Sequence, residues 1–99
     1  MDMTDAYYQA RDGFVHRRVA GNDVLISVGA NVANFNGYIT LNPTASFLWD
    51  ALAEKRTVSA LTGLLTEEFD VPPETARKDV ENFVEMLLRN SMVTVYEDA

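Results

Sequence analysis

Leu41-Asn42-Pro43-Thr44-Ala45-Ser46-Phe47-Leu48-Trp49 is the stretch that decides the fold, because it predicts a strand that turns directly into a helix. Asn42 can cap the helix through its side-chain oxygen, and Pro43 suits the first helical position, where a missing N–H costs nothing. Apolar residues at spacings of three and four predict a helix from residue 43 to about residue 53 with one buried stripe: Ala45, Leu48, Trp49 and Leu52. That stripe needs a sheet or other helices to pack on.

The same stretch ends a longer run without charge. Residues 24–49 contain no charged side chain, although the 23% of charged residues in the whole chain predicts about six of them there. Asparagines, glycines and a proline interrupt the run, so it never offers the roughly 18 apolar residues that a membrane-spanning helix needs. Two interpretations stay open: the run forms only core strands and a core helix, or part of its uncharged surface binds a partner.

The composition predicts one globular domain over residues 1–99. The chain is 47% hydrophobic and 10% aromatic, which is enough to bury a core. The absence of cysteine excludes disulfides, thiolate zinc sites and cysteine nucleophiles. The acidic start is followed by no apolar signal region, so we expect a cytoplasmic protein. We expect residues 1–12 to form a flexible or irregular arm.

Residues 14–41 predict a three-stranded antiparallel sheet in sequential order. Alternating residues 14–20 form the first strand, Gly21-Asn22 forms a two-residue hairpin turn, and residues 24–28 form the return strand. A second Asn-Gly pair, Asn36-Gly37, precedes the third strand at residues 38–41. This pair could instead close a small hairpin between residues 32–35 and 38–41, and the sequence leaves that alternative open.

The second half of the chain predicts two further helices and a final strand. Thr57 caps a helix from residue 58 to about residue 69, and Pro73 opens a third helix that runs to Arg89. Asn90-Ser91 ends that helix, and alternation over residues 92–96 indicates a short strand. We therefore expect an α+β fold that is winged helix-turn-helix-like, with a three-stranded antiparallel sheet followed by three helices and a short C-terminal strand.

No set of residues in the sequence supports an enzyme. His16 is the only histidine, and without a cysteine near it a metal site is not expected. The serines lack a nucleophile-elbow context, and no glycine-rich phosphate loop occurs. The expected protein is therefore non-catalytic, with no cofactor and no metal.

Charge argues against the DNA-binding function that a winged helix would suggest. Between Glu74 and Arg89 the third helix has three basic residues against four acidic ones, and the chain has a net charge of −7. A helix that reads DNA needs an exposed basic face. We keep a winged-helix DNA-binding regulator as the alternative function, and we expect no binding to nucleic acid or membrane.

The third strand indicates a different function because its edge is unguarded. Residues 36–41 contain no Lys, Glu, Asp or Pro, the residues that usually protect a sheet edge against pairing. Either the chain itself covers this edge, with residues 92–96 or with the N-terminal arm, or the edge recruits a strand from a partner. A homodimer paired through this edge is one such arrangement.

Three segments resemble the PqqD family, named for pyrroloquinoline quinone biosynthesis. They are Leu41-Asn42-x-Thr44-Ala45-x-x-x-Trp49-x-x-Leu52, Arg56-Thr57-Val58-x-x-Leu61 and Asp79-Val80-x-x-Phe83-x-x-x-Leu87. Family members end the last helix with glycine, where this chain has Asn90, an acceptable left-handed cap. The resemblance implies a recognition element for ribosomally made, modified peptides. Such a module binds the leader segment of a precursor peptide and presents the core to a radical S-adenosylmethionine enzyme, a cyclase or a leader protease.

The hypothesis for the mechanism joins this resemblance to the open edge. A disordered leader adds as a strand to residues 37–41, and its apolar side chains enter the groove between that strand and the third helix. Trp49 and Leu41 are expected to serve packing within the domain. The opposite flank of the third helix stays an alternative groove wall, with Arg77, Glu81, Val84 and Leu88. The expected peptide-binding residues are Gly37, Tyr38, Ile39, Thr40, Leu41, Lys78, Asp79, Asn82, Phe83 and Met86.

Overall fold

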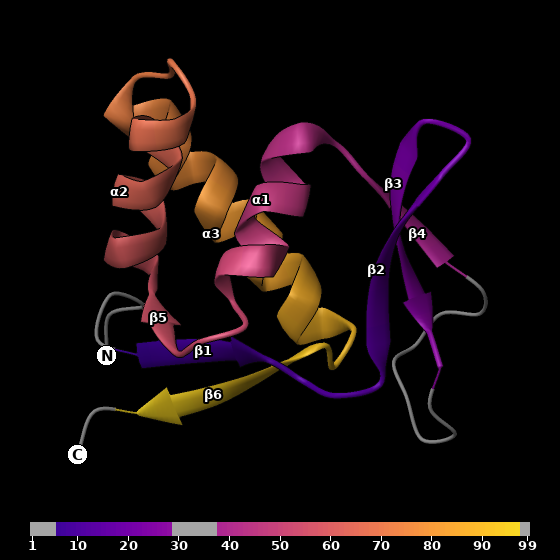
Figure 1. Cartoon of the computed structure of the whole chain (residues 1–99). Helices are drawn as coiled ribbons and strands as arrows, with labels where there is room; N and C mark the ends of the chain where they lie inside the picture. Colours follow the sequence, from indigo (N-terminus) through magenta and orange to yellow (C-terminus); the bar gives the residue numbers. More distant parts are fainter. Residues whose placement is uncertain (1–5, 29–37, 98–99) are drawn as a thin grey trace.

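The computed structural model describes residues 6–28 and 38–97, which form two three-stranded sheets and three helices (Figure 1). This is the expected α+β arrangement, with an antiparallel sheet followed by helices and a C-terminal strand. The helices are α1 (Pro43–Ala51), α2 (Val58–Glu68) and α3 (Pro73–Arg89). The strands are β1 (Ala6–Ala10), β2 (Phe14–Val19), β3 (Asn22–Ser27), β4 (Tyr38–Leu41), β5 (Arg56–Thr57) and β6 (Val93–Glu97).

The predicted antiparallel sheet is confirmed as β2–β3–β4, in sequential order. Its first turn consists of Ala20 and Gly21 rather than Gly21 and Asn22, because Val19 pairs with Asn22. Both turn residues have positive φ, 52° and 85°, which is the pattern of a type I′ hairpin turn. The first strand of the alternative hairpin, residues 32–35, lies outside the described residues.

The pairing register gives this sheet two distinct faces. Leu25 pairs with Ile39, and both belong to the hydrophobic core with the helices. Val24 pairs with Thr40, so these two side chains point to the opposite face. We call the two sides the inner face and the outer face of the β2–β3–β4 sheet.

The flexible or irregular arm predicted for residues 1–12 is wrong for residues 6–10. These residues form β1, which pairs with β5 along one edge and with β6 along the other. Tyr8 of β1 is only 4% exposed and packs in the core. The predicted C-terminal strand is confirmed as β6, but it pairs with β1 and not with β4. The alternative in which one of these two segments covers the edge of β4 is therefore wrong for the described residues.

The helix starts predicted from capping residues are confirmed. The Asn42 Oδ1 accepts the backbone N–H of Ala45 at 2.8 Å, and the Thr57 Oγ1 accepts that of Ala60 at 3.0 Å. Pro72 is the N-cap of α3, so Pro73 takes the first helical position, where the missing N–H costs nothing.

The core joins both sheets to the three helices. Figure 1 shows α1 between α2 and the β2–β3–β4 sheet, with α3 behind α1. The completely buried side chains include Leu52 after α1, Leu61 of α2 and Leu87 of α3. Because β4, α1 and α3 share this core, the junction of β4 and α1 is held in a fixed position relative to α3. No helix in the described part of the chain is long and apolar enough to cross a membrane.

Candidate functional site

Strand β4 is an edge of its sheet. Among residues 6–28 and 38–97, β3 is its only strand neighbour. Tyr38 is 65% exposed and Leu41 is 5% exposed, while Ile39 is half-buried against the core on the inner face. The backbone groups on the free side of an edge strand can pair with an added strand. The edge of β4 is therefore suited to strand addition.

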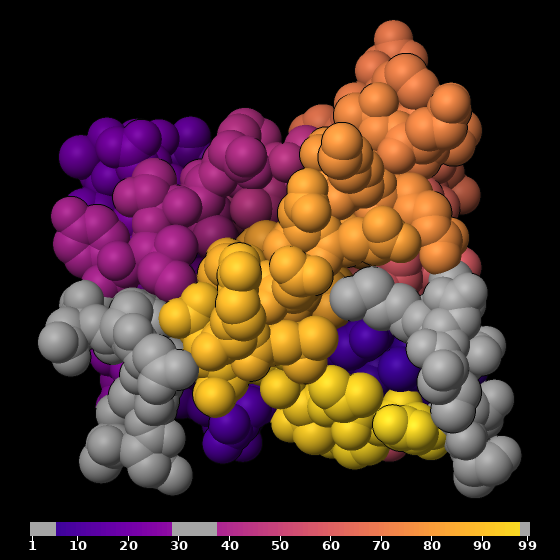
Figure 2. All heavy atoms as spheres, turned by 180° about the vertical axis from the view of Figure 1, so that it is seen from behind, coloured from indigo at the N-terminus to yellow at the C-terminus, as the bar shows by residue number. Residues whose placement is uncertain are grey.

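A hollow of about 240 Å³ lies between the start of α1 and α3. In Figure 2 the orange atoms of α3 lie beside the magenta atoms of β4 and α1. Strand β4 leads into this hollow, because its last residue is followed at once by the N-cap of α1. We call it the α1–α3 hollow; its lining residues are Asn42, Thr44, Ala45, Leu48, Asp79, Asn82 and Phe83.

The α1–α3 hollow has an apolar base and a polar rim. Leu48 and Phe83 are 2% and 9% exposed, so they form its base. Asp79 and Asn82 are exposed, and their side chains make no hydrogen bond or ion pair within the described residues. An apolar side chain can thus be buried here, with polar groups beside it to bond a neighbouring backbone.

Capping fixes the α1 wall of the hollow. The Asn42 Oδ1 accepts the Thr44 hydroxyl at 3.0 Å as well as the Ala45 N–H. The sequence predicts a capping role for Asn42 and a packing role for Ala45, and it does not place either of them, or Thr44, in the hollow. The sequence feature that could have indicated this place is a helix that begins directly after an unguarded edge strand.

Three of the five predicted α3 residues line the hollow. These are Asp79, Asn82 and Phe83. Lys78 is exposed and Met86 is half-buried against the core, and neither lines the hollow. Gly37 lies outside the described residues. The predicted role of all these residues in peptide binding stays a prediction.

The opposite flank of α3 is occupied differently. The Arg77 Nε donates to the Glu81 Oε2 at 3.1 Å, one turn along the same helix. Val84 is completely buried, and Leu88 packs against the core. None of these residues lines the α1–α3 hollow.

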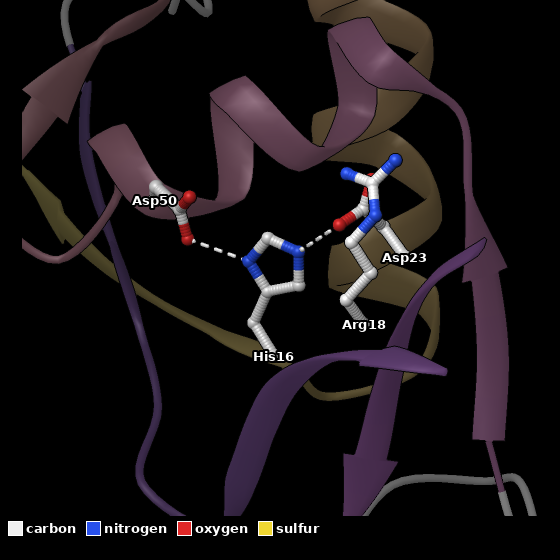
Figure 3. Close-up of polar contacts among 4 residues, drawn as sticks. All are labelled: His16, Arg18, Asp23 and Asp50. Atoms are coloured by element: carbon white, nitrogen blue, oxygen red, sulfur yellow. Dashed lines mark hydrogen bonds and ion pairs between the residues drawn. The ribbon is translucent and has the colours of Figure 1, made fainter. Parts of the chain in front are cut away.

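A polar cluster ties the sheet to α1 (Figure 3). The Nδ1 of His16 lies 2.9 Å from the Oδ1 of Asp50, and its Nε2 lies 3.1 Å from the Oδ1 of Asp23. The Arg18 Nη1 lies 3.7 Å from the other oxygen of Asp23. The hydrogen bond to Asp50, supported by Asp23 and opposed by burial, raises the pKa of His16 above 6.5. When it is protonated, His16 donates to both carboxylates and so joins β2 to β3 and to the last turn of α1.

The sequence alone does not indicate this cluster. The partners of His16 lie 7 and 34 residues away along the chain, so no local spacing points to them. The part of the chain that the structure describes holds no group of three or more His, Cys, Asp or Glu side chains that could bind a metal ion. The observed partners of His16 are carboxylates of the fold itself.

Replacing His16 by Gln is expected to remove a pH-dependent part of the free energy of unfolding. Because the pKa of His16 is higher in the folded chain, its protonated form stabilises the fold below about pH 6.5, and this contribution is lost as the pH rises through the folded-state pKa. Urea denaturation of both proteins at about pH 6 and about pH 8.5 measures the effect. The stability advantage of the unaltered chain over H16Q should shrink at the higher pH.

Asp50→Asn is the matched control for this measurement. The Asp50 side chain is 64% exposed, so its neutralisation leaves no buried defect. The variant keeps His16 but removes the strongest cause of its raised pKa, so the pH dependence should be reduced. If the unaltered chain were more stable than H16Q by the same free energy at both pH values, the role given to His16 would be contradicted.

The chain matches a family model and solved structures. The model described as Coenzyme PQQ synthesis protein D (PqqD) matches residues 19–93. No curated protein matches the chain. TbiB1 in complex with the TbiA(beta) leader peptide has a TM-score of 0.68 at 20% identity, over 91% of this chain and 99% of that chain. Lasso peptide synthetase B1 complexed with the leader peptide has a TM-score of 0.67 at 22% identity, over 88% and 96%. At these identities the likeness shows a shared fold.

Proposed function

The chain belongs to the PqqD family, and on that premise we propose that it is a recognition element for ribosomally synthesised, modified peptides. It binds the leader segment of a precursor peptide and catalyses no step itself. The observation that carries this proposal is the open edge of β4, which leads directly into the α1–α3 hollow. The leader peptides held by the two solved structures of the same fold support it.

In the proposed mechanism the leader adds as a further strand to residues 37–41. Backbone hydrogen bonds along β4 set the direction and register of the peptide. Because side chains alternate along a strand, every second leader residue points to the inner face. Those residues reach the α1–α3 hollow, where Leu48 and Phe83 bury apolar groups and Asn82 bonds polar ones. The backbone hydrogen bonds thus orient the peptide, and the α1–α3 hollow selects which side chains it carries.

The winged helix-turn-helix-like arrangement serves peptide binding in this proposal, not DNA binding. Helix α3 carries more acidic than basic residues. One of its three basic residues, Arg77, is already paired with Glu81. An acidic helix repels the phosphate backbone, and contacts to that backbone supply most of the affinity of non-specific DNA binding.

The bound leader leaves the remainder of the precursor available to a modifying enzyme. That enzyme is a radical S-adenosylmethionine enzyme, a cyclase or a leader protease. A second copy of this chain could pair through the same edge of β4, so a homodimer would compete with the leader.

Calorimetric titration of a synthetic leader peptide is expected to give saturable one-to-one binding. The peptide is the leader of a precursor peptide whose gene is first located by searching the genome around the gene of this chain. Asn82→Arg places a long charged side chain over the α1–α3 hollow and should weaken binding by about tenfold or more. Ser59→Arg makes the same charge change at an exposed position of α2 and should leave the affinity unchanged.

A random DNA duplex is the second arm of this experiment. We expect no binding beyond trace levels in a polarisation titration at physiological salt, because the chain carries a net charge of −7. Micromolar or tighter binding to the duplex would favour the DNA-binding regulator. A folded protein that produced no signal with the leader would overturn the proposed function.

A further inference from the structure

A second hollow lies on the outer face of the β2–β3–β4 sheet. Its volume is about 410 Å³, larger than that of the α1–α3 hollow. Val24 and Ile26 of β3 form its base, and Val19, Tyr38 and Thr40 stand around it. Val24 is 5% exposed, whereas Val19 and Tyr38 are 51% and 65% exposed. We call this apolar depression the outer hollow.

The pairing register connects the outer hollow to the edge of β4. Thr40 pairs with Val24 and Tyr38 pairs with Ile26, so the exposed side chains of β4 form one wall of the hollow. A strand added beyond β4 would extend the same two rows. Side chains directly opposite on neighbouring strands have Cβ atoms about 4.5–5.5 Å apart. Every second residue of an added peptide would therefore stand beside Thr40 or Tyr38 on the outer face.

We propose that the outer hollow is a second subsite for the same peptide, and that it takes a large apolar side chain from the residue opposite Thr40. This inference rests on the proposed strand addition at β4. Thr40 has a short side chain, so an aromatic, leucine or methionine side chain opposite it can lean across the strand toward Val24. Tyr38 then covers one side of the inserted group, as aromatic side chains do in cross-strand pairs.

The chemistry of the bound segment follows from this geometry. Inner-face residues of the peptide reach the α1–α3 hollow, and outer-face residues reach the outer hollow, so both faces of the peptide strand are read. The recognised segment should therefore carry apolar residues at consecutive positions. An amphipathic strand, with apolar residues on the inner face and polar residues on the outer face, would use only half of this surface.

A serine scan of the leader peptide, measured by calorimetry, tests the outer subsite. The probe is the same synthetic leader peptide as in the binding titration, with one residue at a time replaced by serine. Replacing an apolar residue of the peptide, on its inner face or on its outer face, should lower the affinity of the peptide about tenfold, because a buried apolar side chain is lost. Tyr38→Ser should lower the affinity for the unaltered leader. The same variant should lower the affinity less for peptides in which an outer-face residue is already replaced by serine.

The matched protein variant is Asn82→Ser, which alters the rim of the other hollow. Its effect should couple to inner-face positions of the peptide and not to outer-face ones. Tyr38 is mostly exposed and its replacement keeps the backbone N–H, so the fold and strand addition remain available for the test.

The outcomes separate this inference from the proposed function. If only the serine substitutions at inner-face positions lowered the affinity, the outer subsite would be wrong and strand addition would still be supported. No binding of the leader by the folded chain would overturn both. If sedimentation showed that Tyr38→Ser dissociates a dimer while peptide affinity is unchanged, the outer face would be a self-association surface and the inference would be wrong.

Discussion

Trp49→Ala is expected to lower the free energy of unfolding by about 3–5 kcal/mol. Trp49 is 7% exposed in the last turn of α1, and its ring meets the Phe14 ring of β2 edge to face, with centroids 5.9 Å apart. Truncation removes a large buried side chain between helix and sheet, and the cavity adds to the loss. The whole free energy of unfolding of a small domain is about 5–15 kcal/mol, so the variant should lose a large share of its stability.

Urea denaturation followed by circular dichroism measures this loss. Fluorescence cannot be used, because Trp49 is the only tryptophan in the chain. Trp49→Phe is the matched control: it keeps an aromatic ring for the contact with Phe14 and should lose clearly less stability. If Trp49→Ala fails to fold, the comparison of Trp49→Phe with the unaltered chain still tests the packing. Unchanged urea midpoints in both variants would make Trp49 a surface residue.

The helices could be predicted because their starts depend on neighbouring residues. Asn42 and Thr57 accept N–H groups three residues ahead, so the local sequence contains both partners of each cap. The apolar stripe of each helix is likewise a local pattern. These features do not depend on how the chain packs in three dimensions.

Strand β1 could not be predicted in the same way. It is only five residues long, and its partners β5 and β6 lie far along the chain. Tyr7 and Tyr8 have high strand propensity, but an isolated short strand is decided by its pairing partners. The sequence contains no local feature that brings residues 6–10 to residues 93–97.

The hairpin turn between β2 and β3 lies one residue earlier than the turn signal in the sequence predicts. Asparagine and glycine favour positive φ, yet Ala20 takes this conformation and Asn22 stays in the strand. With a turn at Gly21 and Asn22, His16 would lie opposite Ser27 instead of Leu25, and both of these residues point to the same face of β3. The observed register keeps His16 opposite Leu25 and within reach of Asp50. The shift of the turn therefore changes which residue of β3 lies opposite His16, and it leaves the two faces of β2 unchanged.

For the candidate site, the sequence predicts the edge strand and the buried face of α3. The amphipathic pattern of α3 defines its buried stripe but not which flank meets α1. Asp79 and Arg77 stand on either side of that stripe, and only the docking of α1 brings Asp79 to the hollow. Contacts between elements distant in sequence therefore decide the helix wall of the groove.

Replacing Ile39 or Thr40 by proline is expected to abolish leader binding at one of the two positions. Adjacent residues of an edge strand alternate, so one of the two N–H groups points to β3 and the other points outward. Proline at the outward position deletes a donor that the added strand needs, and its ring obstructs the approaching carbonyl. That variant should remain folded, because an outward N–H has no partner within the sheet to lose. Calorimetric titration of the leader, with circular dichroism of each variant, measures both effects.

Ile39→Ala and Thr40→Ala are the matched controls, because they shorten the same side chains and keep both N–H groups. Each should retain measurable binding, so the difference between alanine and proline isolates the backbone donor. Arg77→Glu changes charge on the opposite flank of α3 and should weaken binding only modestly, with a dependence on salt. If both proline variants were folded and bound the leader with full affinity, the peptide would not be held by strand addition. Binding in the α1–α3 hollow alone would then be the better mechanism, and the outer subsite would lose its basis with it.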